Sequence, residues 1–134
     1  MKKLSLIITV IVLFASLVVN GQVDEKQKSV IYDVNVEQFN KLATSDKGIV
    51  LDVRTPGEWE EGVILNATKI NYYDSDFADQ VDVLDKTIPV FVYCKKGGRS
   101  SSAAKILEEK GFTKVFNLKG GITAWKEQGL KIEK

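Results

Sequence analysis

The chain has 134 residues, with 19 Lys and Arg against 18 Asp and Glu, and a formal net charge of +1. This near-neutral balance gives no support for binding to nucleic acid or to another extended polyanion. One cysteine and no histidine are present, which excludes an internal disulfide, Cys–His or Ser–His–Asp catalysis, and the usual zinc and haem ligand sets.

Residues 1–21 have the three-part pattern of a secretory signal peptide. Lys2 and Lys3 form a charged start, an apolar stretch covers 4–19, and small residues precede Gln22. The apolar stretch is shorter than the roughly 20 residues that span a bilayer. We therefore expect export to the periplasm, with membrane contact only if the segment is not removed; an uncleaved anchor is the alternative. Residues 22–29 are polar and are expected to be a flexible lead-in.

Residues 30–134 alternate short apolar runs with amphipathic segments, which predicts one α/β domain with a mainly parallel sheet. Asn35 and Gln38 form a capping box at the start of a helix that ends at 47–48. The apolar runs at 49–53 and 89–93 are continuous rather than alternating, which indicates strands covered on both faces. Further strands are expected at 30–32, 67–71 and 115–118, and helices at 77–84, at 100–110 and after Gly120-Gly121. The segment that follows 55–57 is expected to be a turn into a short acidic stretch.

A loop with unusual composition joins the strand at 89–93 to the next helix, and its residues are Cys94, Lys95, Lys96, Gly97, Gly98, Arg99 and Ser100. Free backbone N–H groups and the positive end of the helix dipole meet at such a turn, and both favour a thiolate. The two glycines permit left-handed backbone angles, and the three cations add positive charge. A lone cysteine at the end of a buried strand is usually structural. These neighbours instead predict a reactive thiol whose pKa is lowered.

Each cation in this loop has a plainer alternative role. Lys95 and Lys96 can be ordinary solvated charges. Arg99 lies at the start of a helix, an unfavourable end for a cation. That placement indicates either a role in the site or a salt bridge to a nearby acid.

Three segments together resemble the single-domain rhodanese-like sulfurtransferases: 51–59, the Cys94 loop, and 118–125. They occur in the order and at the spacing of that family. The resemblance implies a rhodanese-like three-layer α/β domain over 30–134, with a mainly parallel central sheet flanked by helices. This chain departs from the family's usual pattern at Val63 and Asn66, where histidine and glycine are usual. The local turn and any interaction surface there are therefore expected to differ.

The resemblance also implies a reaction at Cys94. The thiol would take a sulfane sulfur from a donor such as thiosulfate and hold it as a persulfide, which a thiol or cyanide acceptor then attacks. The N–H groups of 95–100 would surround the persulfide, and Arg99 with the two lysines would orient a small anionic donor. A protein could also serve as the sulfur acceptor. No metal and no organic cofactor is implied.

Other residues of the matching segments are expected to have supporting roles. Asp52 and Arg54 lie two residues apart at a strand end, and we expect them to brace the loop rather than perform chemistry. Trp59 and Trp125 are expected to be core aromatic residues.

The spacing of the loop distinguishes between reactions of this fold. Four residues separate Cys94 from Arg99, whereas the related dual-specificity phosphatases have five. The shorter loop forms a smaller cradle, which favours sulfur transfer over a phosphatase or arsenate reductase. A non-catalytic module that relays or presents a persulfide to a partner protein is the other alternative.

Overall fold

The computed structural model describes residues 29–45 and 47–134. The predicted signal peptide, and all but the last residue of the predicted lead-in, lie outside the described residues. Within those ranges, no helix has the length and apolar character needed to cross a membrane.

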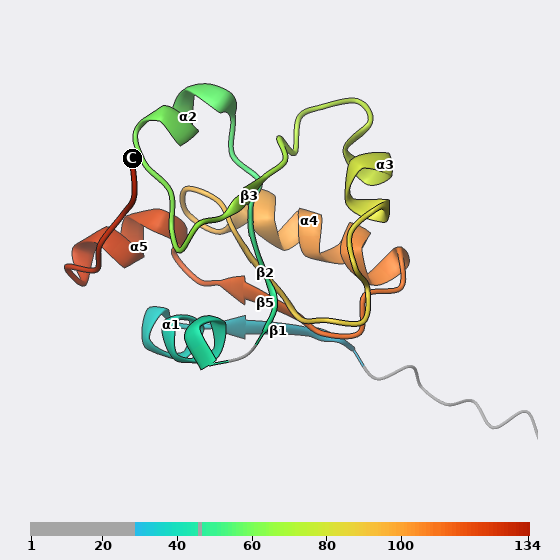
Figure 1. The fold of residues 1–134 in the computed structure, drawn as a ribbon, viewed down its shortest axis with the longest axis horizontal. Helices are drawn as coiled ribbons and strands as arrows, with labels where there is room; N and C mark the ends of the chain where they lie inside the picture. Colours follow the sequence, from blue (N-terminus) through green and yellow to red (C-terminus); the bar gives the residue numbers. More distant parts are fainter. Residues whose placement is uncertain (1–28, 46) are drawn as a thin grey trace, which may run out of the picture.

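In the described residues, five parallel strands form one sheet in the order β1-β5-β4-β2-β3 (Figure 1). They are β1 (Ile31–Val34), β2 (Ile49–Asp52), β3 (Thr68–Lys69), β4 (Val90–Tyr93) and β5 (Val115–Leu118). Strand β4 is central and wholly buried, with Val92 beside Leu51 of β2 and Phe91 beside Phe116 of β5. Its continuous apolar sequence follows from this position, because both of its faces are covered.

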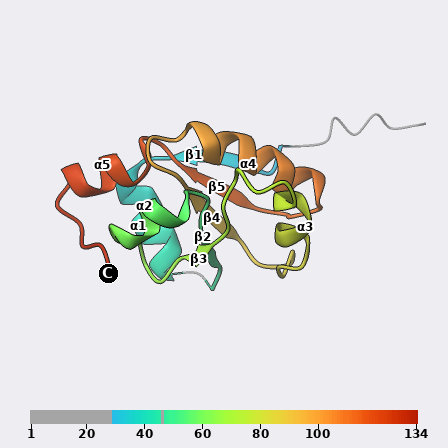
Figure 2. The same ribbon diagram turned by 90° about the horizontal axis from the view of Figure 1, so that it is seen from above.

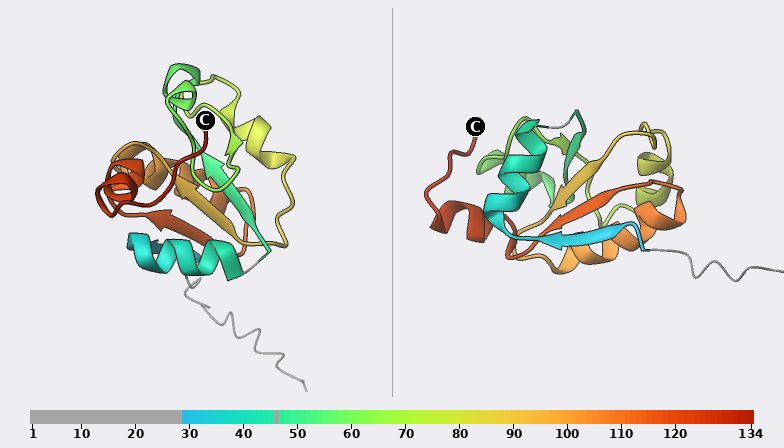
Figure 3. Two further views of the ribbon diagram at one scale, coloured as in Figure 1. Left: turned by 60° about the vertical axis from the view of Figure 1, so that its left-hand side comes forward. Right: turned by 90° about the horizontal axis from the view of Figure 1, so that it is seen from below.

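Helices cover both faces of the sheet and complete three layers (Figures 2 and 3). Those within the described residues are α1 (Val36–Ser45), α2 (Pro56–Glu60), α3 (Phe77–Asp82), α4 (Gly98–Glu109) and α5 (Gly121–Glu127). Phe77 of α3 and Leu107 of α4 belong to one buried cluster, whereas Phe39 of α1 and Trp125 of α5 belong to the other. The predicted three-layer architecture with a parallel sheet is therefore confirmed.

Several element boundaries differ from the predicted ones. The capping box is present, since Gln38 N–H donates to Asn35 Oδ1 at 2.9 Å and Asn35 N–H donates to Gln38 Oε1 at 3.1 Å. Helix α2 was expected only as a turn into an acidic segment; its signal is Pro56, a residue favoured at the first helical position. Helix α4 begins two residues before the predicted 100, and the predicted strand at 67–71 is reduced to β3.

The carboxyl ends of the parallel strands meet at one edge of the sheet, and this edge positions the site. The loop between β4 and α4 lies there, beside α5 and below α2 in the view of Figure 1. Hydrogen bonds connect the segments at this edge: Val53 N–H donates to Tyr93 O at 3.1 Å, and Ile122 N–H donates to Cys94 O at 2.9 Å. The segments at Val53 and Ile122, far apart in sequence, are thereby brought to the end of β4, where Cys94 lies.

Candidate active site

Cys94 is the first residue after β4, and its side chain is buried, with 1% of the residue exposed. Side chains alternate along the strand, so Cys94 points with Val92 into the cluster beneath α3 and α4, while Tyr93 points to the opposite face. The Gly97 N–H donates to Sγ at 3.1 Å, and Ser100 Oγ lies 3.4 Å from Sγ. The thiol is therefore surrounded by apolar side chains on one side and by donors of its own loop on the other.

These donors change the acidity of the thiol. Burial by itself raises the pKa of Cys94, because a thiolate is poorly solvated there. The Ser100 hydroxyl and the backbone N–H groups of Ser100, Gly97 and Lys96 outweigh burial and lower the pKa below its ordinary value. This agrees with the direction predicted from the sequence, and the stabilising groups are dipoles of the loop.

Only one of the paired glycines is required by the backbone. Gly97 has φ +108 directly before α4, a conformation that side-chain-bearing residues rarely adopt. Gly98 is the first residue of α4, and a Cβ added there would meet nothing within 4 Å. Of the two glycines expected to permit left-handed backbone angles, only Gly97 adopts one.

The segment before α5 supports the loop from behind. Ile122 N–H donates to Cys94 O at 2.9 Å, and Thr123 N–H donates to Lys95 O at 3.1 Å. Gly121 has φ +57, and a Cβ there would collide with these two carbonyl oxygens. Gly121 is therefore glycine because the loop backbone approaches it closely, which explains why the segment at 118–125 accompanies the cysteine.

The cations of the loop divide into two kinds. Lys95 and Lys96 are exposed, and neither makes an ion pair with another residue that the structure describes. Arg99 instead donates from Nη1 to Glu58 Oε1 at 2.8 Å and from Nη2 to Oε2 at 3.0 Å. Of the two roles left open for Arg99, the structure shows the salt bridge. Glu58 itself was not singled out by the sequence, because its partner is 41 positions away.

Asp52 and Arg54 form a buried ion pair, 0% and 2% exposed, with Nη2 donating to Asp52 Oδ2 at 2.6 Å. The same Nη2 donates to Gly62 O at 2.7 Å, so the pair connects the end of β2 to the turn that follows α2. Tyr93 completes the network: its hydroxyl donates to Asp52 Oδ2 at 2.7 Å and accepts from Ile64 N–H at 2.9 Å. Burial and the charge of Asp52 raise the pKa of this hydroxyl above its ordinary value, which keeps it protonated as a donor.

The bracing role predicted for this pair stays a prediction. Within the described part of the chain, neither Asp52 nor Arg54 hydrogen-bonds to a residue of 95–100. The pair stabilises the turn at Gly62. Arg54 is next to the loop without bonding to it: together with Lys95 and Glu58 it lines a pocket of about 100 Å³. The guanidinium carbon of Arg54 lies 5.7 Å from the centroid of the Tyr93 ring, and Tyr93 belongs to a different buried cluster from Cys94.

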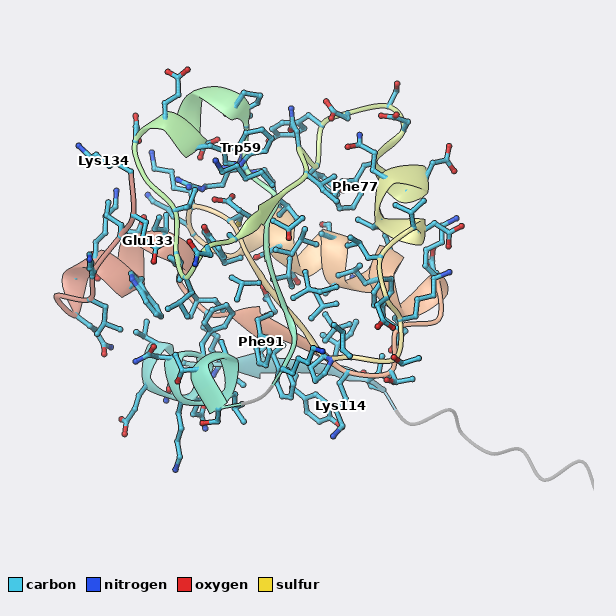
Figure 4. All side chains as sticks on the ribbon, in the orientation of Figure 1. Trp59, Phe77, Phe91, Lys114, Glu133 and Lys134 are labelled. Carbon is cyan, nitrogen blue, oxygen red and sulfur yellow. The ribbon has the colours of Figure 1, made fainter. Side chains whose placement is uncertain are left out.

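The region where the sequence departs from the family pattern has its own geometry. Leu65 and Asn66 have φ of 48° and 54°, left-handed values that asparagine tolerates better than most residues. Asn66 N–H donates to Glu133 Oε2 at 3.0 Å, and Val63 forms an antiparallel bridge with Glu133. Figure 4 shows Glu133 on the C-terminal segment below Trp59 of α2. The turn is thus held by the C-terminal segment.

The two tryptophans differ in their surroundings. Trp125 is 2% exposed, and its indole N–H donates to Lys131 O at 3.0 Å, as expected of a core residue. Trp59 is only half-buried, at the border of the cluster that contains Trp125.

In the parts of the chain that are described, no group of three or more His, Cys, Asp or Glu side chains gathers as a metal site. That no metal or cofactor is needed stays a prediction.

Comparison with known proteins now identifies the family. The family described as Rhodanese-like domain matches residues 35–128. The chain belongs to this family. Over 92 residues, this rhodanese-like protein is 34% identical to a sulfurtransferase of Allochromatium vinosum, which covers 69% of this chain and 84% of the relative.

Further relatives agree with this assignment. The thiosulfate sulfurtransferase GlpE of Coxiella burnetii is 37% identical over 78 residues, covering 58% of this chain and 71% of its own. A solved structure of a rhodanese-related protein from Thermoplasma volcanium matches with a TM-score of 0.67 and 28% identity, over 76% of this chain and 97% of that one. The resemblance drawn from three sequence segments is thus confirmed for the family and for the fold.

Proposed function

We propose that this rhodanese-like protein is a sulfurtransferase that carries a sulfane sulfur on Cys94 as a persulfide. The observation that carries the proposal is the convergence of the Gly97 N–H and the Ser100 hydroxyl on a buried Sγ. Cys94 is the only cysteine of the chain, so sulfur bound covalently to a thiol can reside nowhere else. The relatives that are sulfurtransferases support the same reaction class.

Two displacements at sulfur make up the reaction. The Cys94 thiolate first attacks the outer sulfur of thiosulfate; the donor's S–S bond breaks, a new S–S bond forms at Sγ, and sulfite leaves with the bonding electron pair. A thiol or cyanide then attacks the outer sulfur of the persulfide and releases the thiolate. Loop N–H groups such as that of Gly97 stabilise the negative sulfur in both states. Lys95 and Lys96, which are exposed, attract an anionic donor.

Export belongs to the proposal as well, on the support of the pattern in residues 1–21. A protein in the periplasm could then be the sulfur acceptor in place of a small thiol.

Intact mass spectrometry after incubation with thiosulfate tests the proposal. We expect a gain of one sulfur atom, reversed by cyanide or a thiol and absent in Cys94→Ser. No adduct with any sulfane donor would contradict the proposal. A stable adduct without turnover would favour a persulfide relay instead. Hydrolysis of an aryl phosphate that is lost in Cys94→Ser would favour a phosphatase of the same fold.

A further inference from the structure

The carboxylate of Glu58 occupies the edge of Arg99 that would otherwise bind an anionic substrate. Both terminal nitrogens are engaged at once, at 2.8 Å and 3.0 Å from the two carboxylate oxygens. This paired geometry is the one with which arginine binds carboxylate and phosphate groups. An oxyanion donor would therefore have to displace Glu58 before it could bind this edge of the guanidinium, formed by Nη1 and Nη2.

Glu58 is also held in place from its own helix. The hydroxyl of Thr55, at the start of α2, donates to Glu58 Oε1 at 3.1 Å. The hydrogen bond from Arg99 lowers the pKa of Glu58 to about 2, so the carboxylate remains ionised at neutral pH. The charge of Arg99 is thereby cancelled close to Cys94, and only Lys95 and Lys96 of the loop remain as cations without an ion-pair partner in the described residues.

An aromatic side chain adjoins the ion pair. The ring of Tyr73 lies 5.5 Å from Arg99 Cζ, and 67% of the Tyr73 residue is exposed. Tyr72 packs against it, with ring centroids 5.8 Å apart. An exposed ring offers contact to the carbon atoms of an organic donor, and thiosulfate has none. The cancelled charge of Arg99 and the exposed ring of Tyr73 therefore favour the same class of donor, an organic sulfur compound.

We propose that Glu58 is a specificity-determining residue that selects the sulfur donor by charge, favouring the persulfide of an organic thiol over thiosulfate. This rests on the proposed function, in which Cys94 accepts the sulfur. In the favoured step the Cys94 thiolate attacks the outer sulfur of R–S–SH. The donor's S–S bond breaks, a new one forms at Sγ with the proton kept on the outer sulfur, and R–S⁻ leaves with the bonding pair. That leaving group carries one charge, whereas sulfite carries two and would need the cation that Glu58 occupies.

Single-turnover loading of Cys94 tests this assignment, measured by rapid quench and intact mass spectrometry at low ionic strength. The two donors are thiosulfate and the persulfide of 2-mercaptoethanol, whose carbon part is uncharged. Glu58→Gln removes the charge and keeps an amide oxygen for Arg99, and Glu58→Ala frees Arg99 altogether. Glu60→Gln is the matched control, because Glu60 is exposed as the last residue of α2 and makes no ion pair with any described residue. Thermal unfolding checks that each variant is folded.

In the wild type we expect the organic persulfide to load faster than thiosulfate. Glu58→Gln should raise the thiosulfate rate about tenfold, an effect that added salt reduces, and leave the persulfide rate within about twofold. Equal gains for both donors, an equal effect of Glu60→Gln, or a thiosulfate rate unmoved in both Glu58 variants would overturn the assignment. Those results leave the sulfurtransferase proposal intact, whereas loading from neither donor in any variant overturns both.

Discussion

At the scale of single residues, two groups determine the state of the sulfur. The Gly97 N–H lies within hydrogen-bond distance of Sγ, and Ser100 Oγ lies 3.4 Å from Sγ and 3.2 Å from Gly97 O. A hydroxyl has one proton, so it can donate to the carbonyl beside a neutral thiol and turn to the sulfur when the thiolate forms. Ser100 is therefore the side chain through which the acidity of Cys94 can be changed without replacing the sulfur.

Ser100→Ala should raise the pKa of Cys94, since a hydrogen-bond donor to the charged form of the sulfur is lost. The thiolate would then form at higher pH, and sulfur loading at pH 6 should fall more than loading at pH 9. The ultraviolet absorbance of the thiolate follows this directly, because Cys94 is the only cysteine. Ser101→Ala, an exposed neighbour on α4, is the control. An identical midpoint in both variants would contradict the role of Ser100.

At the scale of elements, the connection from β4 to α4 forms the cradle, and α5 supports it. Helix α4 begins at Gly98, so its first turn directs free N–H groups toward the sulfur. The N–H groups of Ile122 and Thr123 bond to the carbonyl oxygens of Cys94 and Lys95 on the other side of the loop. The loop is thus fixed by its two neighbouring helices, and its shape depends on the left-handed residue before α4.

The two glycines of the loop should respond differently to alanine. Gly97→Ala forces a side chain into φ +108 and should cost about 1–3 kcal/mol in the free energy of unfolding, together with slower sulfur loading. Gly98→Ala should be neutral or slightly stabilising, because the added Cβ has open space in a helical position. Urea unfolding and single-turnover loading of both variants measure this. Equal losses in the two would show that the backbone angle at Gly97 is not what matters.

At the scale of the whole molecule, the carboxyl edge of the sheet is tied together by a buried charged network. Asp52 and Arg54 are almost inaccessible to water, and Tyr93 connects them to the turn at Ile64. Burial and Asp52 have opposite effects on the pKa of Arg54; the hydrogen bonds and charge of Asp52 prevail and raise it. Such a pair is strongly destabilised when one partner is lost, because the other charge stays buried.

Arg54→Met should therefore lower the free energy of unfolding by about 3–5 kcal/mol. Lys86→Met is the control, because Lys86 pairs with Asp82 on the surface at 2.6 Å and such pairs contribute little. We expect no clear change for it in the same urea titration. The double variant Arg54→Met with Asp52→Asn should lose less than Arg54→Met alone. If Arg54→Met and Lys86→Met behaved alike, the network would not be what stabilises this edge.

Much of the fold could be predicted from local sequence patterns, that is, from residues that lie close together in the chain. The apolar runs of β2, β4 and β5, the capping box of α1 and the turn around Cys94 depend on residues within a few positions of one another. Local periodicity and capping chemistry therefore carry the information. Helix α2 was missed because five residues are too few for a periodic pattern.

The candidate site likewise has features that local sequence predicts and features that depend on distant segments. The sequence predicts the cradle and the lowered pKa of Cys94, because a thiol, a glycine and the start of a helix lie within seven residues of one another. The partner of Arg99 could not be read locally, because Glu58 reaches it only through the order of the strands and the packing of α2. The tether from Tyr93 to Ile64 and the bridge from Val63 to Glu133 likewise join distant segments. The hydrogen-bond donors around Cys94 come from residues next to it in the chain, so the sequence alone predicts them. The neutralisation of Arg99 by Glu58 depends on which segments the sheet brings together, so only the tertiary structure decides it.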